Sequence, residues 1–377
     1  MSEPARPLKV LCIVGARPNF MKIAPLMRAF RSRPQDFQAF LLHTGQHYDE
    51  AMKESIFRQL DIPEPDIDLE VGSGSHAQQT AQIMLRFEPA LDDIQPDVLL
   101  VVGDVNSTIA CALVAVKKGI PVVHVEAGLR SGDREMPEEI NRVLTDQISD
   151  TLYTTEPDGQ ANLVREGVDP QRVVFVGNVM IDTLFANREK AQPAAQTLGD
   201  AGLDPASDYG VLTLHRPSNV DDPVVLERLV NTLVALSAKL PLVFPTHPRT
   251  AARLQEFGLD KVLEQGRIHR LPPLGYLQLL GLMDGARMVL SDSGGIQEET
   301  TALGVPCITL RENTERPVTV TDGTNTIVGT SAEAIRACFS DVMESGGKAG
   351  RVPDLWDGKA AERIADDLLK RYRKADS

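Results

Sequence analysis

Short, continuous apolar runs alternate with helix-forming segments along nearly the whole chain. A strand in a parallel sheet is covered on both faces by connecting helices, so its sequence is apolar throughout. The pattern therefore predicts an α/β fold built from two doubly wound, Rossmann-like domains. The expected strands are Leu8–Val14, Phe37–Leu42, Val98–Val102, Pro121–Val125, Thr151–Thr154 and Val173–Val176 in the first half, and Tyr209–Leu214, Leu242–Pro245, Arg267–His269, Met288–Leu290 and Val305–Leu310 in the second.

The chain is expected to divide into two domains and a final helix. Residues 1–178 form the predicted N-terminal domain and residues 179–357 the predicted C-terminal domain. Residues 191–207 are small, polar and rich in Pro and Gly, which is typical of a loop near an interdomain hinge. Residues 358–377 contain an amphipathic segment, which we expect to form a helix that packs back on the N-terminal domain.

The composition argues against several classes of protein. A net charge of −14 disfavours a nucleic-acid surface or an anionic membrane as the partner. No stretch approaches the roughly 20 apolar residues of a membrane span, and the N-terminus has no apolar run of signal length. The four cysteines are far apart in the sequence, which indicates free thiols in a reducing compartment. We expect a cytoplasmic protein.

The segment Val289–Glu299 has the pattern of a phosphate-binding turn. An apolar strand stops at Ser291-Asp292, and Ser293, Gly294 and Gly295 lead into a helix. A helix start carries unpaired N–H groups and about half a positive charge, and glycines let an anion approach them closely. The segment therefore predicts a diphosphate cradle, with Glu299 one turn further on to hold a ribose diol. The structural alternative is an ordinary helix capped by Asp292 or Ser293.

Polar residues also follow the other predicted strands, where ligands bind in open α/β sheets. They are Arg17, Gln46-His47, Asp104, Glu126 and His215-Arg216. Each has a structural alternative: Asp104 could cap a helix, His215 could be a core histidine, and Arg17 and Lys22 could be solvated. A buried carboxylate such as Glu126 is costly unless it is paired.

The remaining histidines give no sign of a metal site. His43 and His47 are four residues apart, but Gly45 lies between them and no third ligand is near in the sequence. His124, His247 and His269 are expected to be structural. No metal site is therefore predicted.

A short charged loop leads to a helix that begins at Pro137. Glu138 and Glu139 fall in its first turn, where acidic residues are favourable even without a catalytic role. Asn141 and Arg142 follow on the same helix, and we expect them to direct Glu138 toward the cleft between the domains.

Eight motifs follow one another along the chain: GARPNFMKIAP (15–25), GDVNST (103–108), HVEAGLRSGD (124–133), PEEINR (137–142), GN (177–178), HRPSN (215–219), DSGGIQEE (292–299) and ENTERP (312–317). Together they resemble one enzyme family, the non-hydrolysing UDP-N-acetylglucosamine 2-epimerases. The resemblance implies the glycosyltransferase-B fold, with the active site in the cleft between two Rossmann-like domains, and a homodimer. It also implies reversible interconversion of UDP-GlcNAc and UDP-ManNAc for cell-surface polysaccharide precursors.

The resemblance also assigns a role to each motif residue, with no cofactor and no metal. It implies that UDP leaves C1 and that a carboxylate takes the C2 proton, giving 2-acetamidoglucal, before UDP adds back to C1. The base remains open between Glu126 and Asp104. The implied catalytic residues are Asp104, Glu126 and Glu138, with His215 assisting and Lys22 and Arg142 supporting; the implied substrate ligands are Arg17, His215, Ser293, Gly294 and Gly295 for the diphosphate, Glu299 for the ribose, Leu279 near the uracil and Arg316 in the nucleotide site.

Two departures from the family pattern matter. The usual acidic residue after the Arg-Pro pair is Asn19 here, and the loop between Asp133 and Pro137 is only Arg134-Glu135-Met136. Family members that a second UDP-GlcNAc activates have a longer, aromatic loop at this place, so we expect no such activation.

Two alternative functions stay open: an epimerase of another UDP-2-acetamido sugar, and a hydrolysing enzyme that releases ManNAc and UDP. PEEINR and GDVNST argue against a glycosyltransferase of the same fold. A non-catalytic nucleotide-sugar-binding protein could lose the carboxylates, and here all of them are present.

Overall fold

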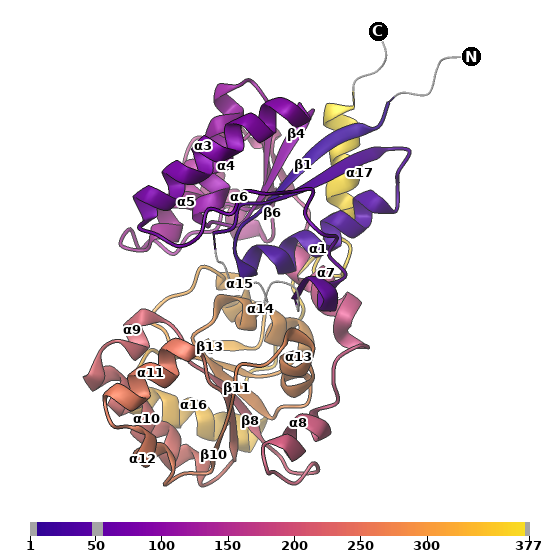
Figure 1. The fold of residues 1–377 in the computed structure, drawn as a ribbon. Coiled ribbons are helices and arrows are strands. Elements are labelled where there is room, and N and C mark those ends of the chain that lie inside the picture. Colours follow the sequence, from indigo (N-terminus) through magenta and orange to yellow (C-terminus); the bar gives the residue numbers. More distant parts are fainter. Residues whose placement is uncertain (1–5, 47–55, 374–377) are drawn as a thin grey trace. The chain divides into compact units, whose positions relative to one another are not determined.

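The computed structural model describes residues 6–46 and 56–373, and the chain divides into two compact units (Figure 1). The first unit comprises residues 1–186 and 354–377, and the second comprises residues 187–353. Each unit is built around one parallel sheet with helices on its faces. His47, which the sequence places at a strand exit, lies outside the described residues.

The first unit contains a seven-stranded sheet in which every pairing is parallel, as predicted. The spatial order is β3-β2-β1-β4-β5-β6-β7, so the order reverses between β1 and β4. In doubly wound sheets ligands bind at the carboxyl ends of the strands beside such a switch point. The strands are β1 (Leu8–Val14), β2 (Phe37–His43), β3 (Ile67–Asp68), β4 (Val98–Val102), β5 (Val122–Ala127), β6 (Thr151–Thr154) and β7 (Val173–Phe175).

The helices of the first unit connect these strands and bury them. All five residues of β4 are buried, which explains why its sequence is apolar throughout. The helices are α1 (Arg17–Arg31), α3 (His76–Ile94), α4 (Asn106–Lys117), α5 (Pro137–Ile148), α6 (Pro157–Arg165), the short 3₁₀ helix Pro170–Arg172, α7 (Val179–Arg188, which runs into the second unit) and α17 (Ala360–Tyr372).

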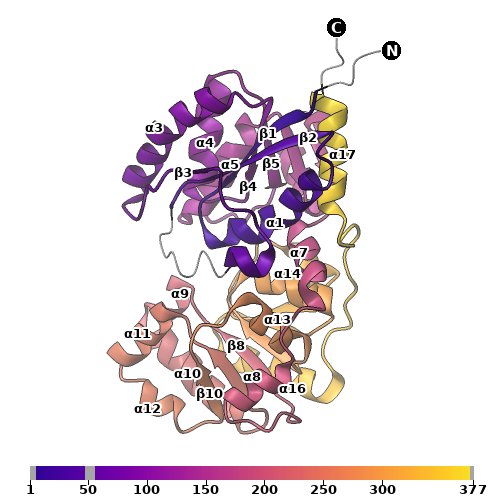
Figure 2. The same ribbon diagram turned by 45° about the vertical axis from the view of Figure 1, so that its right-hand side comes forward.

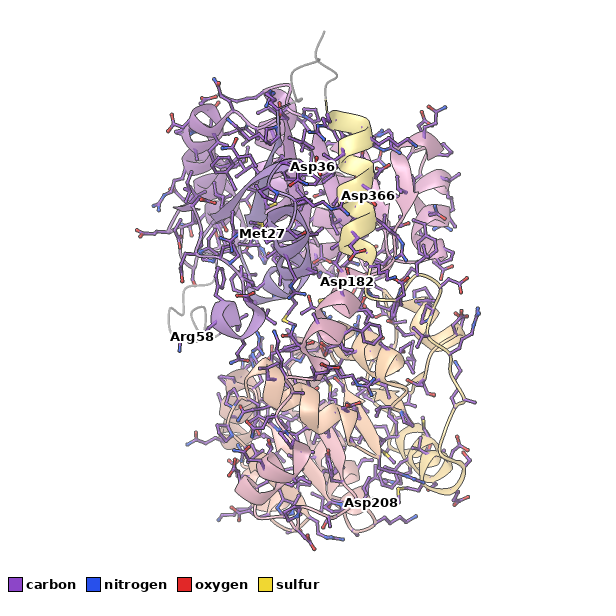
Figure 3. All side chains as sticks on the ribbon, turned by 90° about the vertical axis from the view of Figure 1, so that its right-hand side faces the viewer. Met27, Asp36, Arg58, Asp182, Asp208 and Asp366 are labelled. Atoms are coloured by element: carbon purple, nitrogen blue, oxygen red, sulfur yellow. The ribbon has the colours of Figure 1, made fainter. Side chains whose placement is uncertain are left out.

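The C-terminal helix α17 belongs to the first unit and packs on α1 (Figures 2 and 3). The Asp182 carboxylate, on α7, accepts hydrogen bonds from the first two N–H groups of α17, at 3.1 Å from Ala360 and 2.7 Å from Ala361. Burial raises the pKa of Asp182 to about 6, although these two N–H groups act in the opposite direction. A distant carboxylate therefore caps this helix, because its own N-cap residue, Lys359, supplies no side-chain bond.

The second unit contains a six-stranded parallel sheet in the order β10-β9-β8-β11-β12-β13. Its switch point lies between β8 and β11. The strands are β8 (Gly210–Thr213), β9 (Leu242–Pro245), β10 (Ile268–Leu271), β11 (Met288–Ser291), β12 (Cys307–Thr309) and β13 (Asn325–Ile327), and the helices are α8 (Ala194–Asp200), α9 (Pro217–Val220), α10 (Pro223–Ser237), α11 (Pro248–Glu256), α12 (Asp260–Leu263), α13 (Tyr276–Asp284), α14 (Gly294–Leu303), α15 (Pro317–Thr321) and α16 (Ala332–Ser345).

The segment 191–207, which we expected to be a loop, contains the short helix α8. Thr197 and Leu198 on this helix are buried, and Leu198 packs in an apolar cluster with Tyr209 and Met283. This packing stabilises a two-turn helix whose composition alone favours a loop. The strand β13 was also absent from the sequence-based expectation, because three residues are too few for a periodic signal.

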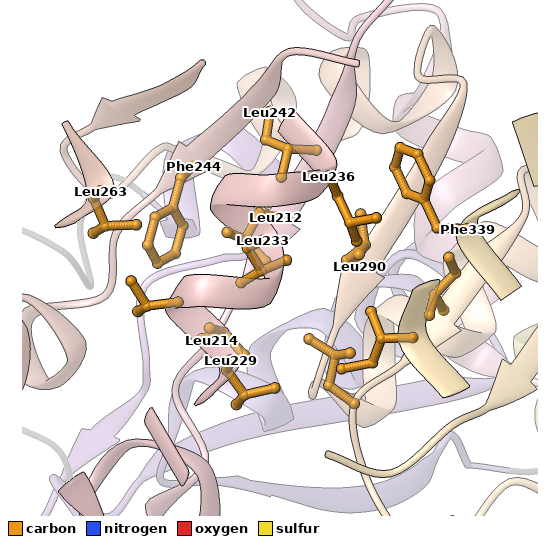
Figure 4. Close-up of a cluster of buried hydrophobic side chains, with 14 of the residues drawn as sticks. Leu212, Leu214, Leu229, Leu233, Leu236, Leu242, Phe244, Leu263, Leu290 and Phe339 are labelled. Atoms are coloured by element: carbon orange, nitrogen blue, oxygen red, sulfur yellow. The ribbon is translucent and has the colours of Figure 1, made fainter. Parts of the chain in front are cut away.

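The main core of the second unit lies between its sheet and the helices α10 and α16 (Figure 4). Leu229, Leu233 and Leu236 of α10 contribute to it, and Phe339 of α16 is fully buried in the same cluster. This core holds the sheet rigidly, so the carboxyl ends of β8 and β11 keep a fixed spacing.

Candidate active site

Two candidate carboxylates follow neighbouring strands of the first sheet. Asp104 comes two residues after the end of β4, and Glu126 lies at the end of β5. Val102 of β4 pairs with Val125 of β5, so the two acidic residues leave the same edge of the sheet on adjacent strands. The sequence-based expectation that polar side chains gather at this edge is met for this pair.

Glu126 occupies a strained backbone position. Its φ angle is +73°, in the left-handed region that favours glycine, and the β5–β6 register shifts between Val125 and Ala127. A non-glycine residue held in this region costs on the order of 1–3 kcal/mol, and such residues cluster at functional sites. The bulge turns the Glu126 side chain away from the regular strand alternation.

The Glu126 carboxylate is paired with a buried lysine from α1. The Nζ atom of Lys22 lies 2.7 Å from Oε1 of Glu126, and the two side chains are 8% and 1% exposed. The lysine compensates the negative charge that the sequence analysis identified as costly to bury. Lys22 is therefore not a solvated helix residue. Arg17, at the first position of α1, has an exposed side chain.

Asn19 joins the start of α1 to the end of β4. Its Oδ1 atom accepts from the N–H groups of Gly15 (3.3 Å) and Ala16 (3.2 Å), and its Nδ2 atom donates to the carbonyl oxygen of Val102 at 2.9 Å. A carboxylate at this position could not donate the last bond. The Asn19 amide therefore has a structural role: it holds the backbone at Val102, two residues before Asp104.

Asp104 is held by Arg142 of α5. The Nε and Nη2 atoms of Arg142 lie 3.0 Å and 2.5 Å from Oδ2 of Asp104. Asn141 of the same helix donates to the backbone oxygen of Asp104 at 2.9 Å. The Asp104 carboxylate thus forms an ion pair instead of capping α4, whose N-cap residue is Val105.

The adjacent glutamates of α5 have different surroundings. Glu139 is buried and accepts bonds from the N–H and Oγ of Ser131, the N–H of Gly132 and Nη1 of Arg142, at 2.7–3.0 Å. Glu138 is half-buried and makes no hydrogen bond or ion pair with the residues that the structure describes. The expectation that Asn141 and Arg142 direct Glu138 is wrong: they bind Asp104, and Arg142 also binds Glu139.

Glu139 is a residue that the sequence analysis missed. It is the third residue of α5, and a glutamate at this position commonly reaches back to the N–H groups before the helix. That positional rule could have identified it. The bonds fix the loop at Ser131-Gly132 and, through Arg142, the Asp104 carboxylate.

In the second unit, His215 and Asp292 follow the two strands at the switch point. Asp292 accepts from the backbone N–H groups of His215 and Arg216 at 2.9–3.1 Å, and from Nδ2 of Asn219 at 3.2 Å. Its Oδ1 atom also lies 2.9 Å from Nδ1 of His215. Burial would raise the pKa of Asp292, but the His215 side chain and these N–H groups hold it below its ordinary value.

The contact with Asp292 orients the His215 side chain. It also bears on two structural alternatives from the sequence: His215 as a core histidine, and Asp292 as the cap of α14. The His215 side chain is 37% exposed, so it is not a core histidine. Asp292 does not cap α14, because its carboxylate accepts hydrogen bonds from the loop that follows β8. Ser293 is the N-cap residue, but its side chain makes no capping bond.

The start of α14 leaves room beside Gly294. A Cβ atom built there would have Oε1 of Glu315 as its nearest neighbour, at 4.0 Å, and Gly294 is not at a positive φ angle. The protein itself therefore does not require glycine at this position. The N–H of Ser293 donates to Oγ of Ser291 at 3.0 Å, which fixes the turn that precedes the helix.

The remaining candidate residues surround the same helix. Arg316 is buried, and its Nε atom donates to Oε1 of Glu298 at 2.7 Å. Glu299 is buried beside the Tyr276 hydroxyl, whose pKa is raised well above its ordinary value by burial and by this carboxylate. Leu279, on α13, is partly buried against an apolar cluster of the second unit.

Arginines surround one buried carboxylate, Glu315, in this part of the second unit. Arg311 pairs with Glu315 at 2.8 Å, and Arg216 lies 3.5 Å from the same carboxylate. Burial alone would raise the pKa of Glu315, but Arg311, Arg316 and Arg216 lower it to about 2. Glu315 therefore stays ionised and pairs with Arg311 and Arg216.

The structure thus places the predicted residues in two groups, each within one unit. In the first unit the group at the sheet edge is Lys22, Asp104, Glu126 and Arg142, with Glu138 and Arg17 on helices that begin there; in the second unit it is His215, Ser293, Gly294, Gly295, Glu299 and Arg316, with Leu279 on the adjacent helix.

The described parts of the chain, 6–46 and 56–373, hold no group of three His, Cys, Asp or Glu side chains that could bind a metal ion. Within the same residues, no helix has the length and apolar character needed to cross a bilayer.

Comparison with known proteins identifies relatives over almost the whole chain. Residues 28–369 match the family model described as UDP-N-acetylglucosamine 2-epimerase. The UDP-N-acetylglucosamine 2-epimerase of Methanocaldococcus jannaschii is 41% identical over 363 residues, covering 95% of this chain and 98% of that protein. The UDP-2,3-diacetamido-2,3-dideoxy-D-glucuronate 2-epimerase of Pseudomonas aeruginosa is 39% identical over 371 residues, covering 96% and 100%.

A solved structure confirms the fold. The crystal structure of the Methanocaldococcus jannaschii UDP-GlcNAc 2-epimerase in complex with UDP-GlcNAc and UDP matches with a TM-score of 0.87 at 40% identity, covering 96% of this chain and 100% of that one. The two parallel sheets with their helices correspond to the predicted glycosyltransferase-B type of α/β fold.

Proposed function

The chain belongs to the UDP-N-acetylglucosamine 2-epimerase family, and from this premise we propose that it interconverts UDP-GlcNAc and UDP-ManNAc by inverting C2 of the sugar. The observation that carries the proposal is the buried Lys22–Glu126 pair on a left-handed bulge, one strand away from Asp104. The buried Glu126 and the half-buried Asp104 at one sheet edge supply acid–base groups for a reaction that moves one proton. We assign the product to the synthesis of cell-surface polysaccharide precursors.

We assign UDP recognition to the second unit. The diphosphate binds at the start of α14, where Ser293 has a side chain that is not used for capping and Gly294 has no packing reason to be glycine. The helix dipole and the unpaired N–H groups favour an anion there. We assign His215, oriented by Asp292, and Arg17 as further donors to the diphosphate, and Glu299 as the ligand of the ribose.

The reaction proceeds by elimination and re-addition. The C1–O bond breaks with its electron pair passing to UDP, and a carboxylate removes the C2 proton, so that a C1=C2 double bond forms in 2-acetamidoglucal. A second group returns a proton to the opposite face of C2, and the UDP oxygen adds to C1. Glu126 and Asp104 are the candidates for the base, with Glu138 as the third carboxylate; His215 and the arginines stabilise the departing diphosphate.

The decisive experiment is incubation of the purified protein with UDP-GlcNAc in deuterated water. Proton NMR should show loss of the C2 proton signal and a second UDP-sugar anomeric signal. Absence of deuterium at C2 would remove the proposal. Free ManNAc and UDP among the products would identify a hydrolysing enzyme instead, and a requirement for an acceptor would identify a glycosyltransferase.

A second substrate class has a specific observation in its favour. The Pseudomonas aeruginosa relative, named for a diacetamido-glucuronate, is nearly as similar as the epimerases named for UDP-GlcNAc. Parallel assays with UDP-GlcNAc and with UDP-2,3-diacetamido-2,3-dideoxy-D-glucuronate separate the two by their kcat/KM values.

We also propose that the protein is a homodimer that acts in the cytoplasm. Leu85 on α3 and Ile140 and Leu144 on α5 are 66%, 43% and 50% exposed, and both helices pack against α4 (Figures 1 and 2). Exposed apolar side chains on the helices that flank α4 are typical of an association surface. Light scattering should give twice the chain mass of 41.1 kDa, and Leu144→Arg should reduce it to that of a monomer.

A further inference from the structure

Asp146 makes a buried cluster of contacts beside both candidate carboxylates of the first unit. Its Oδ1 atom lies 2.7 Å from Nδ1 of His124, and its Oδ2 atom accepts from the N–H of Gly128 at 3.1 Å. Arg130 adds a contact to Oδ2 at 2.7 Å. The side chains of His124 and Asp146 are both 0% exposed.

These contacts span the bulge that carries Glu126. His124 comes two residues before Glu126 and Gly128 two residues after it, so the Asp146 carboxylate joins the two flanks of the left-handed residue. A strained φ angle persists when surrounding contacts hold the backbone on both sides. The ion pair with Lys22 fixes the Glu126 side chain, whereas Asp146 fixes the backbone from which it extends.

The other nitrogen of His124 reaches the second carboxylate. Its Nε2 atom lies 2.8 Å from the carbonyl oxygen of Gly103, the residue before Asp104. A carbonyl oxygen can only accept, so Nε2 is the donor. Through His124, Asp146 is therefore connected to the peptide that precedes Asp104 as well as to the bulge of Glu126.

Helix α5 carries Asp146 four residues after Arg142, on the same face. Arg142 holds the Asp104 carboxylate, while Asp146 and His124 hold the backbone next to it. Two residues on one face of α5 therefore position the catalytic pair: Arg142 holds the side chain of Asp104, and Asp146 holds the backbone beside Asp104 and Glu126. The family resemblance assigns no role to Asp146 or His124.

We infer that Asp146, together with His124, is a positioning residue that holds Glu126 and Asp104 in register for proton transfer at C2. The inference rests on the proposed function. Neither residue is required to touch the substrate, so their loss should lower kcat with little change in KM. Proton transfer is sensitive to the position of the base, and a displacement of about 1 Å can lower a rate about 10²-fold.

The test compares Asp146→Asn with a matched control, Asp150→Asn. Asp150 accepts from the N–H of Val122, at the opposite end of the same strand β5. Asp146→Asn should lower kcat at least tenfold and leave the affinity for UDP within twofold, because the UDP ligands lie mainly in the second unit. Asp150→Asn should change kcat less than twofold. Equal kcat in the two variants would overturn the inference.

A double-mutant cycle separates positioning from a general loss of structure. In a background with both Glu126→Gln and Asp104→Asn, Asp146→Asn should lower the residual kcat by less than threefold, because both carboxylates that it positions have gone. The same fold-loss in both backgrounds would indicate a structural effect alone and would contradict the inference.

If Asp146→Asn does not fold, His124→Gln takes its place. A glutamine amide can still donate to the Gly103 carbonyl but loses the link to Asp146. It should also lower kcat at least tenfold, and wild-type kcat in this variant would overturn the inference. Turnover of the wild-type protein in the same assay tests the proposed function separately, because the inference depends only on ratios between variants.

Discussion

The ammonium group of Lys22 lies 2.7 Å from the carboxylate of Glu126, and both side chains are almost completely buried. The two residues are 104 positions apart in the sequence. A buried pair of this kind contributes little net stability, but removal of one partner leaves an uncompensated charge. The presence of this ion pair on a strained bulge is therefore better explained by a catalytic role of Glu126 than by a contribution to stability.

Substitution of either carboxylate should lower turnover strongly. Glu126→Gln or Asp104→Asn should reduce kcat by about 10²-fold or more, the usual contribution of a positioned acid or base. The affinity for UDP should change little, since the nucleotide is assigned to the second unit. Steady-state kinetics and calorimetric titration with UDP measure the two effects. Wild-type turnover in both variants would contradict the assignment of Glu126 and Asp104 as acid–base residues.

Ser293→Ala should weaken UDP binding by about 1.5–3 kcal/mol, through the loss of one hydrogen bond to a charged group. Stability should change little, because the Ser293 side chain makes no capping bond in the protein. The control is Ser331→Ala, which removes the capping bond of α16 in the same unit. That variant should be less stable but should bind UDP normally. Calorimetry and urea unfolding distinguish the two patterns, and unchanged UDP affinity in Ser293→Ala would contradict the assigned cradle.

Asp182 should make the stability of the first unit depend on pH. Its pKa is raised from 3.8 to about 6 by burial, so the folded state holds the proton more tightly than the unfolded state. The free energy of unfolding should therefore fall as pH rises from about 4 to about 6, by up to about 3 kcal/mol from this group.

The measurement is urea unfolding followed by the fluorescence of Trp356, the single tryptophan, which is buried in the first unit. The wild type should lose this stability over that pH range relative to Asp182→Asn. Asp366→Asn, which removes an exposed carboxylate of α17, is the control for loss of a negative charge beside or on the helix that Asp182 caps (Figure 3). A constant difference between wild type and Asp182→Asn from pH 4 to pH 7 would contradict the prediction.

The enzyme should not need its substrate as an activator. The loop before α5 is short, and Glu139 fixes it through bonds to Ser131 and Gly132. Rates measured with UDP-ManNAc should follow a hyperbola without added UDP-GlcNAc. A sigmoidal curve that traces of UDP-GlcNAc convert to a hyperbola would show that activation does occur.

Much of this architecture could be predicted from the sequence. The continuous apolar runs indicated parallel sheets because buried strands leave no polar face, and polar residues at the strand ends marked Asp104, Glu126 and His215 as candidates. Glycines and a serine before a helix marked the turn at Ser293. Such signals are local, because they follow from the period and the ends of single elements.

The partners of these residues were decided by the tertiary structure. No local pattern links Lys22 to Glu126 or Asp146 to His124. The sequence around Glu126 also does not predict a left-handed backbone, since the position is not a glycine. Helix α5 directs Glu139 and Asp146 inward while Glu138, its adjacent residue, stays half-buried. A sequence shows which side chains can carry charge, but the energy of burying a charge depends on which distant groups the fold brings within hydrogen-bond distance.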